Sequence, residues 1–531
     1  ASKQKIRIDR PLDFLVVADH SEMLQLEVRL DKEDPVFLAT ASGKRLAAAQ
    51  KTNPRAAFAE VGQIGRGGGE EVLRDFNTVE IRRRTWGDQV DIAERHNHPG
   101  KFTAMIGWEW SPAPNWANLH RVIFTPANAE TAKKFVPLGY YDTEKPEELW
   151  AWLDKTSKET GADFVAIPHN SNMSDGKMFD VVDSDGRPFT AAYARTRMRW
   201  EPVMEITQIK GTSEVHPQFS PEDPFAGFEI RNKLLTGADA KVSPNSYARS
   251  ALLQGMQMEA NIGANPYKFG FVGGTDSHTG LTSVREDDFL GKLVSDSLPA
   301  SRVAMQGNFA AWDTSAGGLA GVWATENTRE AIAEAFKRKE VYGTSGPRIA
   351  LRFFGGFDFE AADALLTDAA ETGYKKGVPM GGDLSTAPPG KVPTFLVQVS
   401  KDPLSGNLDR VEIIKGWLDA KGKTHEKVYD VAWAGERKPD AKGFVPALPS
   451  TVNIETASYD NTQGAVQLNA MWRDPSFDPK QRAFYYVRAL EIETPRHQVY
   501  DAVALKIDPK KSGKPLTIQE RAWSSPIWYT P

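Results

Sequence analysis

Histidine and carboxylate side chains stand at the ends of several apolar runs in this 531-residue sequence. Asp276 and His278 follow the run 269–274, which reads Phe-Gly-Phe-Val-Gly-Gly. The same pattern recurs with Asp19 and His20 after residues 14–18, Glu109 after residues 104–108, and His169 after residues 164–168. Imidazole and carboxylate groups are ligands that suit zinc, manganese and iron. These residue types therefore indicate a site for divalent metal ions.

The spacing of these residues indicates the kind of fold that would bring them together. A single buried histidine at a strand end is more often a hydrogen-bonded core residue than a metal ligand. Strands that repeatedly stop at a ligand-type side chain are typical of a barrel or a doubly wound sheet, with the site at the carboxyl ends of the strands. The sequence has no cysteine, which disfavours a structural zinc site. The joint pattern favours metal-dependent hydrolysis.

Longer stretches around these residues resemble the polymerase and histidinol phosphatase (PHP) superfamily. In chain order they are RPLDFLVVADHSEM (10–23), NHPGKFTAMIGWEW (97–110), NLHRVIF (118–124), AIPHNSN (166–172), EPVMEITQIKG (201–211), NPYKFGFVGGTDSHTG (265–280) and YGTSGPRI (342–349). The similarity is closest to a large bacterial branch of unassigned function, which also ends in segments like QERAWSSPIWYTP (519–531). It extends over nearly the whole chain.

The resemblance implies both a fold and a ligand set. It implies an α/β fold with a distorted (β/α)7 PHP-type barrel that holds two or three divalent ions, which would be zinc, manganese or iron. The metal ligands that carry over to this sequence are His20, Glu109, His120, His169, Asp276 and His278. Glu109 would bridge two cations, and a hydroxide between them would act as the nucleophile.

One part of the superfamily pattern has no counterpart. Members open with a His-x-His word on a first strand upstream of the position of His20, and these two histidines would share a metal with Asp276. The present sequence begins at Ala1, only about one strand before His20. The chain is therefore expected to be either an N-terminally shortened form or a member with fewer metals. The shortened form is favoured because every later ligand position is intact.

The sequence does contain His96-Asn97-His98, but in the wrong order relative to the other motifs. It lies downstream of His20 and directly after the helix-like stretch Asp88–Arg95. We expect this pair to lie at a solvent-facing helix end rather than at the metal site.

Several polar residues near the predicted strand ends could bind substrate. Lys210 and Arg348 could neutralise an anionic oxygen, Arg348 as a bidentate fork, although ordinary ion pairs explain both equally well. Asn170 and Asn172 could orient substrate or simply form a turn. For His216, a role towards substrate and an exposed loop position are equally compatible with the sequence.

The pattern of elements changes near residue 347. The segment 1–347 alternates strands with helices, including Glu147–Thr160 between Pro146 and Gly161, and a helix 331–339 after the capping-box sequence Asn-Thr-Arg-Glu. The segment 348–531 has apolar residues at every second position, with Gly, Pro and Asp breaks. We expect a metal-binding barrel over 1–347 and a β-rich, antiparallel, sandwich-like domain packed on it over 348–531.

Composition excludes some classes of function. The net charge of −5 gives no basic surface for nucleic acid, and no apolar run approaches the roughly 20 residues of a membrane span. The absence of cysteine excludes disulfides and thiolate ligands and is compatible with an oxidising compartment. Together with the resemblance, it slightly favours a periplasmic or secreted location. His425 and His497 fall in the β-rich segment and are expected to be structural or exposed.

These observations predict a metal-dependent hydrolase, with the resemblance pointing to a phosphoesterase of small anionic esters. Glu109, Asp276 and Arg348 are the predicted catalytic residues, and Arg348 would hold equatorial oxygens of the phosphoryl group. Two other readings stay open. One is hydrolysis of another ester or amide, and the other is a metal-binding protein without turnover.

Overall fold

The computed structural model describes residues 7–53, 70–280, 283–304 and 310–531, and its first sheet carries several of the predicted strand ends. Its strands, in spatial order, are β1 (Phe14–Val16), β2 (Thr103–Trp110), β3 (Arg121–Thr125) and β4 (Val165–Pro168). β1 runs parallel to β2, whereas β3 runs antiparallel to both β2 and β4. β2 is an inner strand of this sheet and is buried along its whole length, so it is covered on both faces.

A second, three-stranded sheet carries the remaining strand ends of the site. Its order is β6 (Gly211–Thr212), β5 (Val203–Gln208) and β7 (Gly270–Gly273). β5 and β7 run parallel and are buried throughout, as expected for strands that are covered on both faces.

The expected closed (β/α)7 barrel is not detected. In the described part of the chain, the two sheets form separate hydrogen-bonded ladders rather than one closed ring. The physical reason lies partly in β3. A parallel neighbour for β2 would need a crossover of a dozen or more residues, whereas the link from Trp110 to Arg121 contains only the short 3-10 helix Pro114–Trp116. The chain therefore returns antiparallel at this point.

Helices cover these two sheets, and the sequence predicted two of them well. α8 (Pro146–Thr160) begins at the predicted proline and ends at Gly161, which adopts the left-handed conformation. α12 (Arg329–Lys337) is capped by Thr328, whose hydroxyl accepts a hydrogen bond from the Ala331 amide at 3.3 Å, so it begins and ends two residues earlier than expected. The other helices in this half are α6 (Val79–His96), α7 (Ala129–Ala132), α9 (Ala191–Trp200), α10 (Ala248–Ile262) and α11 (Pro299–Ala304).

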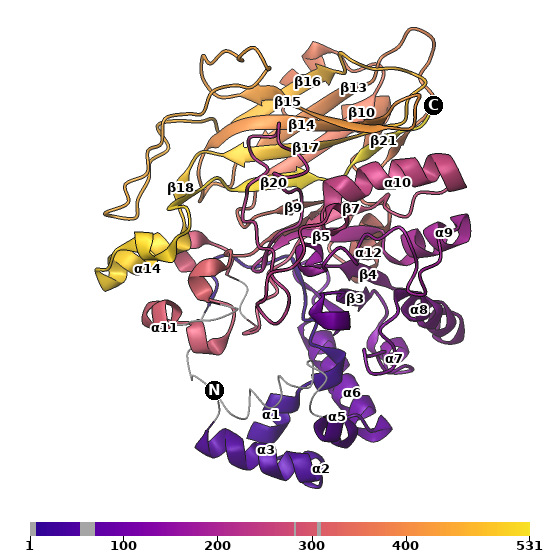
Figure 1. Cartoon of the computed structure of the whole chain (residues 1–531), viewed down its shortest axis with the longest axis vertical. Helices are drawn as coiled ribbons and strands as arrows, with labels where there is room; N and C mark the ends of the chain where they lie inside the picture. The colour runs from indigo at the N-terminus through magenta and orange to yellow at the C-terminus, as the bar shows by residue number, and fades with distance from the viewer. Residues whose placement is uncertain (1–6, 54–69, 281–282, 305–309) are drawn as a thin grey trace.

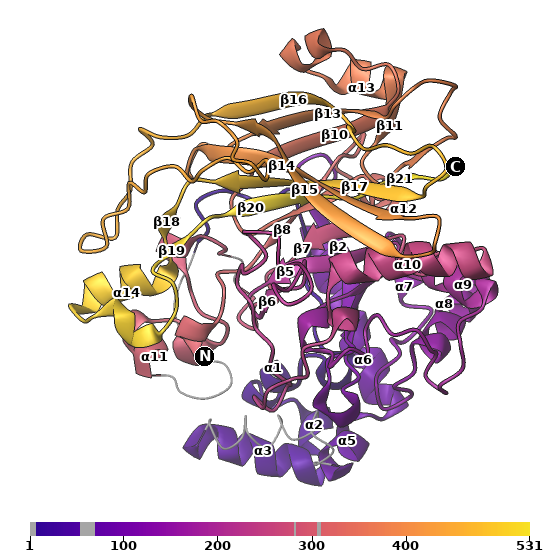
Figure 2. The same ribbon diagram turned by 45° about the horizontal axis from the view of Figure 1, so that its top comes forward.

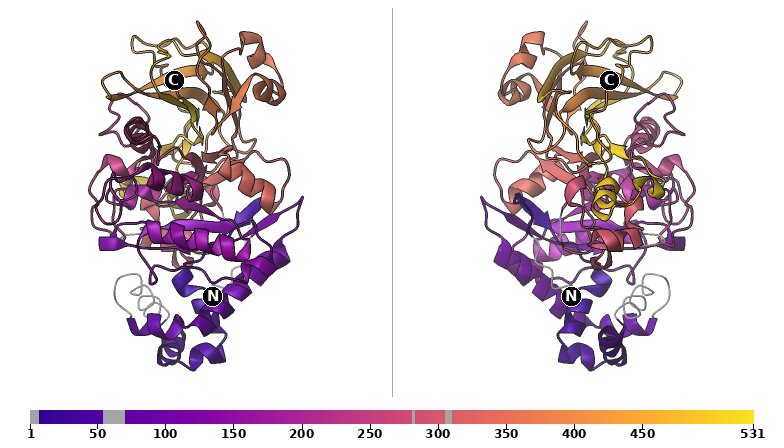
Figure 3. Two further views of the ribbon diagram at one scale, coloured as in Figure 1. Left: turned by 90° about the vertical axis from the view of Figure 1, so that its right-hand side faces the viewer. Right: turned by 90° about the vertical axis from the view of Figure 1, so that its left-hand side faces the viewer.

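Four further helices form a small helical unit at the end of the molecule opposite the C-terminal sheets (Figures 1 and 3). They are α1 (Leu26–Asp31), α2 (Pro35–Leu38), α3 (Ala41–Thr52) and α5 (Glu70–Phe76). Leu30, Phe37, Leu46 and Phe76 are among the buried residues that hold the unit together. None of the helices in the described residues is both long enough and apolar enough to cross a membrane.

The C-terminal half consists of two stacked, mainly antiparallel sheets, as the alternating pattern predicted (Figure 2). One sheet has the order β11-β10-β13-β16, and the other contains β12-β21-β17-β20-β9-β8, with β14 and β15 added beside β17. Phe353 and Phe395 from the first sheet and Val411 and Tyr485 from the second share one apolar core. The strands are β8 (Leu319–Val322), β9 (Val341–Thr344), β10 (Ala350–Gly356), β11 (Gly377–Pro379), β12 (Asp383–Leu384), β13 (Thr394–Ser400), β14 (Leu408–Leu418), β15 (Thr424–Trp433), β16 (Gln467–Arg473), β17 (Ala483–Glu491), β20 (Arg521–Ser524) and β21 (Ile527–Tyr529).

The rest of this half is small. It comprises α13 (Ala370–Lys376), α14 (His497–Leu505) and the strand pair β18 (Thr494–Pro495) and β19 (Thr517–Ile518).

The larger C-terminal sheet continues across residue 347. β8 and β9 precede that residue, yet β9 pairs with β20 near the end of the chain. β7 packs against this sheet at very short range. A Cβ atom at Gly273 would lie 2.6 Å from the Leu319 carbonyl oxygen, and one at Gly343 would lie 3.0 Å from the Val272 carbonyl carbon. The absence of a side chain at these positions lets the two backbones touch.

A buried ion network also joins the two halves. Arg488 on β17 contacts Glu214 Oε1 at 3.1 Å, Asp223 Oδ1 at 2.7 Å and Glu412 Oε2 at 2.6 Å. Arg249 on α10 adds contacts of 2.8 Å to both Glu214 and Asp223. All five side chains are buried, so each charge depends on its partners for compensation.

Replacing Arg488 should therefore destabilise the fold strongly. We expect Arg488→Ala to lower the free energy of unfolding by about 3–5 kcal/mol, because Glu214, Asp223 and Glu412 would keep buried charge without this cation. Arg482→Ala is the matched control. Arg482 is partly exposed and forms a longer ion pair of 3.5 Å with Glu259, so its loss should lower the free energy of unfolding by less than about 1 kcal/mol. Urea denaturation measures both, and equal losses in the two variants would contradict the assignment.

Candidate metal centre

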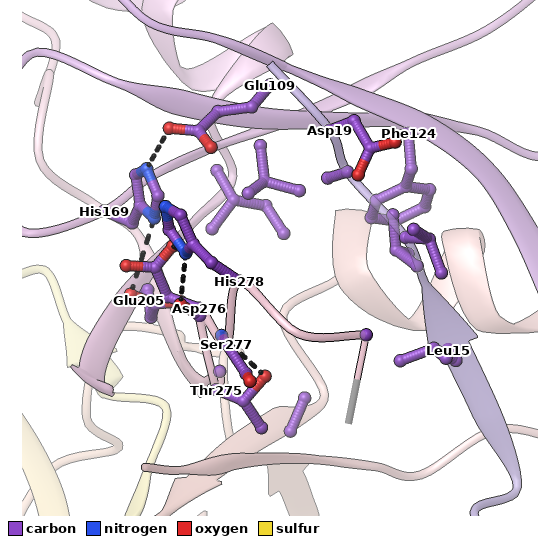
Figure 4. Close-up of a pocket in the computed structure, with 18 of the residues that line it drawn as sticks. Leu15, Asp19, Glu109, Phe124, His169, Glu205, Thr275, Asp276, Ser277 and His278 are labelled. Carbon is purple, nitrogen blue, oxygen red and sulfur yellow. Dashed lines mark hydrogen bonds and ion pairs between the residues drawn. The ribbon is translucent and has the colours of Figure 1, made fainter. Parts of the chain in front are cut away.

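The predicted ligand residues gather in one large cleft at the ends of the two small sheets. The cleft has a volume of about 1840 Å³. Figure 4 shows Glu109, His169, Asp276 and His278 on one side of it, with Asp19 on the other. The lining includes all six predicted metal ligands, namely His20, Glu109, His120, His169, Asp276 and His278.

The tightest group is a triad of His20, Glu109 and His120, whose candidate ligand atoms all lie within 4.8 Å of one another. Glu109 Oε1 lies 2.5 Å from His120 Nδ1, and Glu109 Oε2 lies 3.6 Å from His20 Nδ1. The backbone fixes this arrangement, because the Glu109 amide donates to the Asp19 carbonyl at 2.9 Å beside His20. Ser111 Oγ, 2.5 Å from His20 Nδ1, orients the ring.

His169 and Glu205 extend the triad towards the second sheet. His169 Nε2 lies 3.1 Å from Glu109 Oε1, and its other ring nitrogen lies 3.7 Å from Glu205 Oε1. His169 Nδ1 and Glu205 Oε1 are buried and lack a hydrogen-bond partner among the described residues. One oxygen of Glu109, Oε1, therefore lies between the His120 and His169 imidazoles.

Burial and neighbouring charges set the protonation of this group. Burial raises the pKa of Glu109, but His20, His169 and His120 outweigh it and hold that pKa well below its usual range. Burial lowers the pKa of His120 to about 4, against the opposing effect of Glu109. At neutral pH the group therefore contains an ionised carboxylate and a neutral imidazole at His120, the forms that bind metal ions.

Asp276 and His278 reach the same cleft but stand in a different environment. Asp276 Oδ2 lies 2.6 Å from Lys210 Nζ and 3.4 Å from Lys292 Nζ. Lys292 Nζ also lies 2.7 Å from His278 Nδ1, and the His278 ring centre is 5.9 Å from that of His20. Asp276 has a positive φ of 50°, which is unusual for a residue other than glycine. In this structure, two ammonium groups contact the Asp276 carboxylate.

The other predicted substrate residues lie in different places. Arg348 lines the cleft, and one of its guanidinium nitrogens donates to the Arg10 carbonyl at 3.1 Å. Asn170 is buried, with a side-chain amide that lacks a partner among the described residues. Asn172 stabilises the turn that contains Lys210, because its side-chain Nδ2 donates a hydrogen bond to the Lys210 carbonyl at 3.1 Å.

The remaining histidines lie away from the cleft lining. The ring nitrogen Nε2 of His216 lies 3.2 Å from Asn232 Nδ2. His96 is the last residue of α6, and both His96 and His98 are exposed, as expected for a solvent-facing helix end. His425 lies 2.7 Å from Asp419 Oδ2, and the buried His497 lies 2.7 Å from the Thr314 carbonyl oxygen.

The structure adds two residues that the sequence did not place in the site. Glu205 lies inside β5, and burial raises its pKa to about 7. The sequence signal for Glu205 was a carboxylate inside the apolar run of β5, because a carboxylate is rarely buried without a role or a partner. Lys292 lies on an irregular segment and follows only the short stretch Phe289-Leu290-Gly291, so no periodic pattern marked it.

The donor set suits a divalent transition metal. Imidazole and carboxylate groups of the triad converge without any thiolate, and the unpaired His169 Nδ1 and Glu205 Oε1 are further donors whose burial would be costly if they stayed unpaired. His20, Glu109 and His120 would hold one cation, and His169 and Glu205 lie beside this triad.

Removing the Glu109 charge should therefore remove metal. We expect Glu109→Gln to weaken metal affinity by about 10–100-fold or more, because a neutral amide is a poorer ligand than a carboxylate and cannot bridge two cations. His96→Ala and His98→Ala should leave metal content unchanged. Elemental analysis after reconstitution decides the matter, and loss of metal in the His96 or His98 variants but not in Glu109→Gln would refute the ligand assignment.

Comparisons with known proteins place the chain in a family but do not assign an activity. No curated protein and no solved structure gives a significant match to this chain. A family model described as "Protein of unknown function (DUF3604)" matches residues 1–531. That description names neither a reaction nor the PHP superfamily. Because the match spans the whole chain, the protein belongs to the DUF3604 family.

Proposed function

We propose that this protein is a metal-dependent hydrolase and that its substrates are phosphoesters. The observation that carries the proposal is the buried Glu109 carboxylate, which lies within 3.6 Å of imidazole nitrogens from His20, His120 and His169. These side chains come from different strand ends and face a cleft large enough for a small organic ligand. A buried, ionised carboxylate among imidazoles beside a cavity is the kind of cluster that marks candidate functional sites.

Two or three ions of zinc, manganese or iron would complete the site. When bound, such ions would supply Lewis-acid activation of water and of the scissile ester. His20, Glu109, His120 and His169 are the proposed ligands nearest to one another. Asp276 and His278 would become ligands as well when a cation replaces the two lysine ammonium groups beside the Asp276 carboxylate.

The side chains of the protein would then do three things. Glu109 would hold its imidazole neighbours in place, as its contacts to His120 and His169 already do. Ser111 would fix the His20 ring. Arg348, from the cleft wall, would neutralise charge on the substrate, and Asp276 would anchor the positively charged side of the cleft.

The PHP resemblance of the sequence supports the finer parts of the proposal. It supports the phosphoester preference, and it supports a reading of the two small sheets as parts of one distorted PHP-type barrel. β4 lies beside β5, while β1 and β7 are the outer strands of their sheets. In this reading residues 1–347 form the metal-binding part and residues 348–531 the β-rich domain packed on it.

The test combines metal loading with a panel of esters. Protein reconstituted separately with zinc, manganese and ferrous ions should hydrolyse a generic aryl phosphate faster than the metal-free protein, and Glu109→Gln should abolish the gain. Glu330→Gln, an exposed substitution in the first turn of α12, is the matched control. Carboxylic esters and amides form the second arm of the panel.

The outcomes separate the readings. Turnover of carboxylic esters or amides, without turnover of any phosphate ester, would replace the phosphoesterase assignment by another hydrolase. Stoichiometric metal without hydrolysis of any ester or amide would favour a binding protein. Protein that takes up no transition metal under any condition would refute the proposal.

A further inference from the structure

Lys210 and Lys292 are two buried lysines that share one carboxylate. Their side chains are 5% and 3% exposed, and both ammonium groups contact Asp276 Oδ2. Burying an ammonium group is costly without compensation, and here both groups turn to the same carboxylate. The nearby Glu205 carboxylate lies 3.7 Å from the His169 ring nitrogen Nδ1. Two lysine amine groups therefore converge on one point of the cleft.

The backbone holds both lysines in place. The Lys210 amide donates to Gln208 Oε1 at 2.6 Å, and Asn172 holds its carbonyl. The Lys292 carbonyl accepts from the His278 amide at 2.9 Å, and its amide donates to Asp296 Oδ2 at 3.1 Å. These contacts fix the stems from which the ammonium groups extend, as a binding site requires.

The lysines lie close to the proposed metal ligands. Both line the same cleft as His20, Glu109 and His120. Lys292 Nζ contacts the His278 ring, whose centre is 5.9 Å from the His20 ring centre. A group of the size of a phosphate can therefore reach from the ammonium groups towards the triad.

We propose that Lys210 and Lys292 form an oxyanion-binding pair, which holds the charged group of the ligand beside the His20–Glu109–His120 triad. The pair takes a dianionic oxyanion, as in a phosphate monoester, in preference to a monoanion such as a carboxylate. Lysine presents a compact charge with three donors, and two such groups match the charge of a dianion. On binding, the dianion accepts hydrogen bonds from the two ammonium groups that contact Asp276 in this structure. The inference rests on the proposed function and names the residues that would recognise its substrate.

The test uses inorganic phosphate as the probe, with sulfate and acetate as comparison anions, and calorimetry on metal-loaded protein. We expect phosphate and sulfate to bind more tightly than acetate. Lys210→Met and Lys292→Met should each weaken phosphate binding by about 10–100-fold, because each variant loses a charge-assisted hydrogen bond to the anion. Lys101→Met is the matched control, because it removes an exposed lysine from the lining of the same cleft and should change the affinity by less than about threefold.

A second measurement does not depend on the variants folding. In the wild-type protein, phosphate should protect Lys210 and Lys292 from amine acylation, while Lys101 stays reactive; mass spectrometry reads the three sites. Protection of the two buried lysines by phosphate supports the pair, and equal labelling with and without phosphate overturns it.

The outcomes also distinguish this inference from the proposed function. Unchanged phosphate affinity in both Met variants overturns the oxyanion pair. So does the uptake of an additional metal ion by Lys292→Met with unchanged phosphate binding, which would mean that the lysines stand in a metal position. If the wild-type protein takes up no metal, yet binds phosphate through both lysines, the hydrolase proposal fails and the oxyanion pair stands.

Discussion

The candidate site depends on keeping Glu109 ionised in a buried position. A buried carboxylate is unfavourable unless charges or hydrogen bonds compensate it, and here histidines from other strand ends supply that compensation. The requirement explains why the surrounding strands must end together. β1 brings His20 beside Glu109, β3 is preceded by His120, and β4 is followed by His169. A shift of any of these strands by one residue would turn its ligand side chain away.

The cleft has two poles of different chemistry. One pole is a carboxylate surrounded by imidazoles, and the other is the Asp276 carboxylate between two ammonium groups. The poles meet where the His278 ring approaches the His20 ring. A cation is attracted to the first pole and an anion to the second, so a ligand that carries both an electrophilic centre and negative oxygens would fit between them. Neither pole alone would select such a ligand.

The sequence predicted the features that depend on local patterns. Apolar runs that stop at His20, Glu109, His169 and Asp276 could be recognised without a structure, because burial requires apolar residues and a polar residue marks where burial ends. α8 was predicted from Pro146, its apolar face and Gly161, and the alternating C-terminal strands from their period of two. These are all properties of neighbours in the chain.

Features that depend on distant pairing could not be predicted. The link before β3 is too short for a parallel crossover, but the sequence of β3 itself does not show that β2 and β4 become its antiparallel partners. Lys292 joins the site only because an irregular segment folds back over Asp276, so nothing in its own surroundings marked it. The continuation of one sheet across residue 347 was likewise hidden, because the composition changes there while the hydrogen bonding does not.

The glycine contact between β7 and the larger C-terminal sheet has a consequence for the evolution of this protein. At Gly273 and Gly343 backbone lies directly on backbone, so no side chain is present that could change size to absorb a mismatch. Asp276 follows β7 by only three residues, and any displacement of the C-terminal sheet would be passed to it. The two halves can therefore diversify only in concert at this contact. A lineage that exchanged its C-terminal sheet for an unrelated module would have to rebuild the position of Asp276 as well.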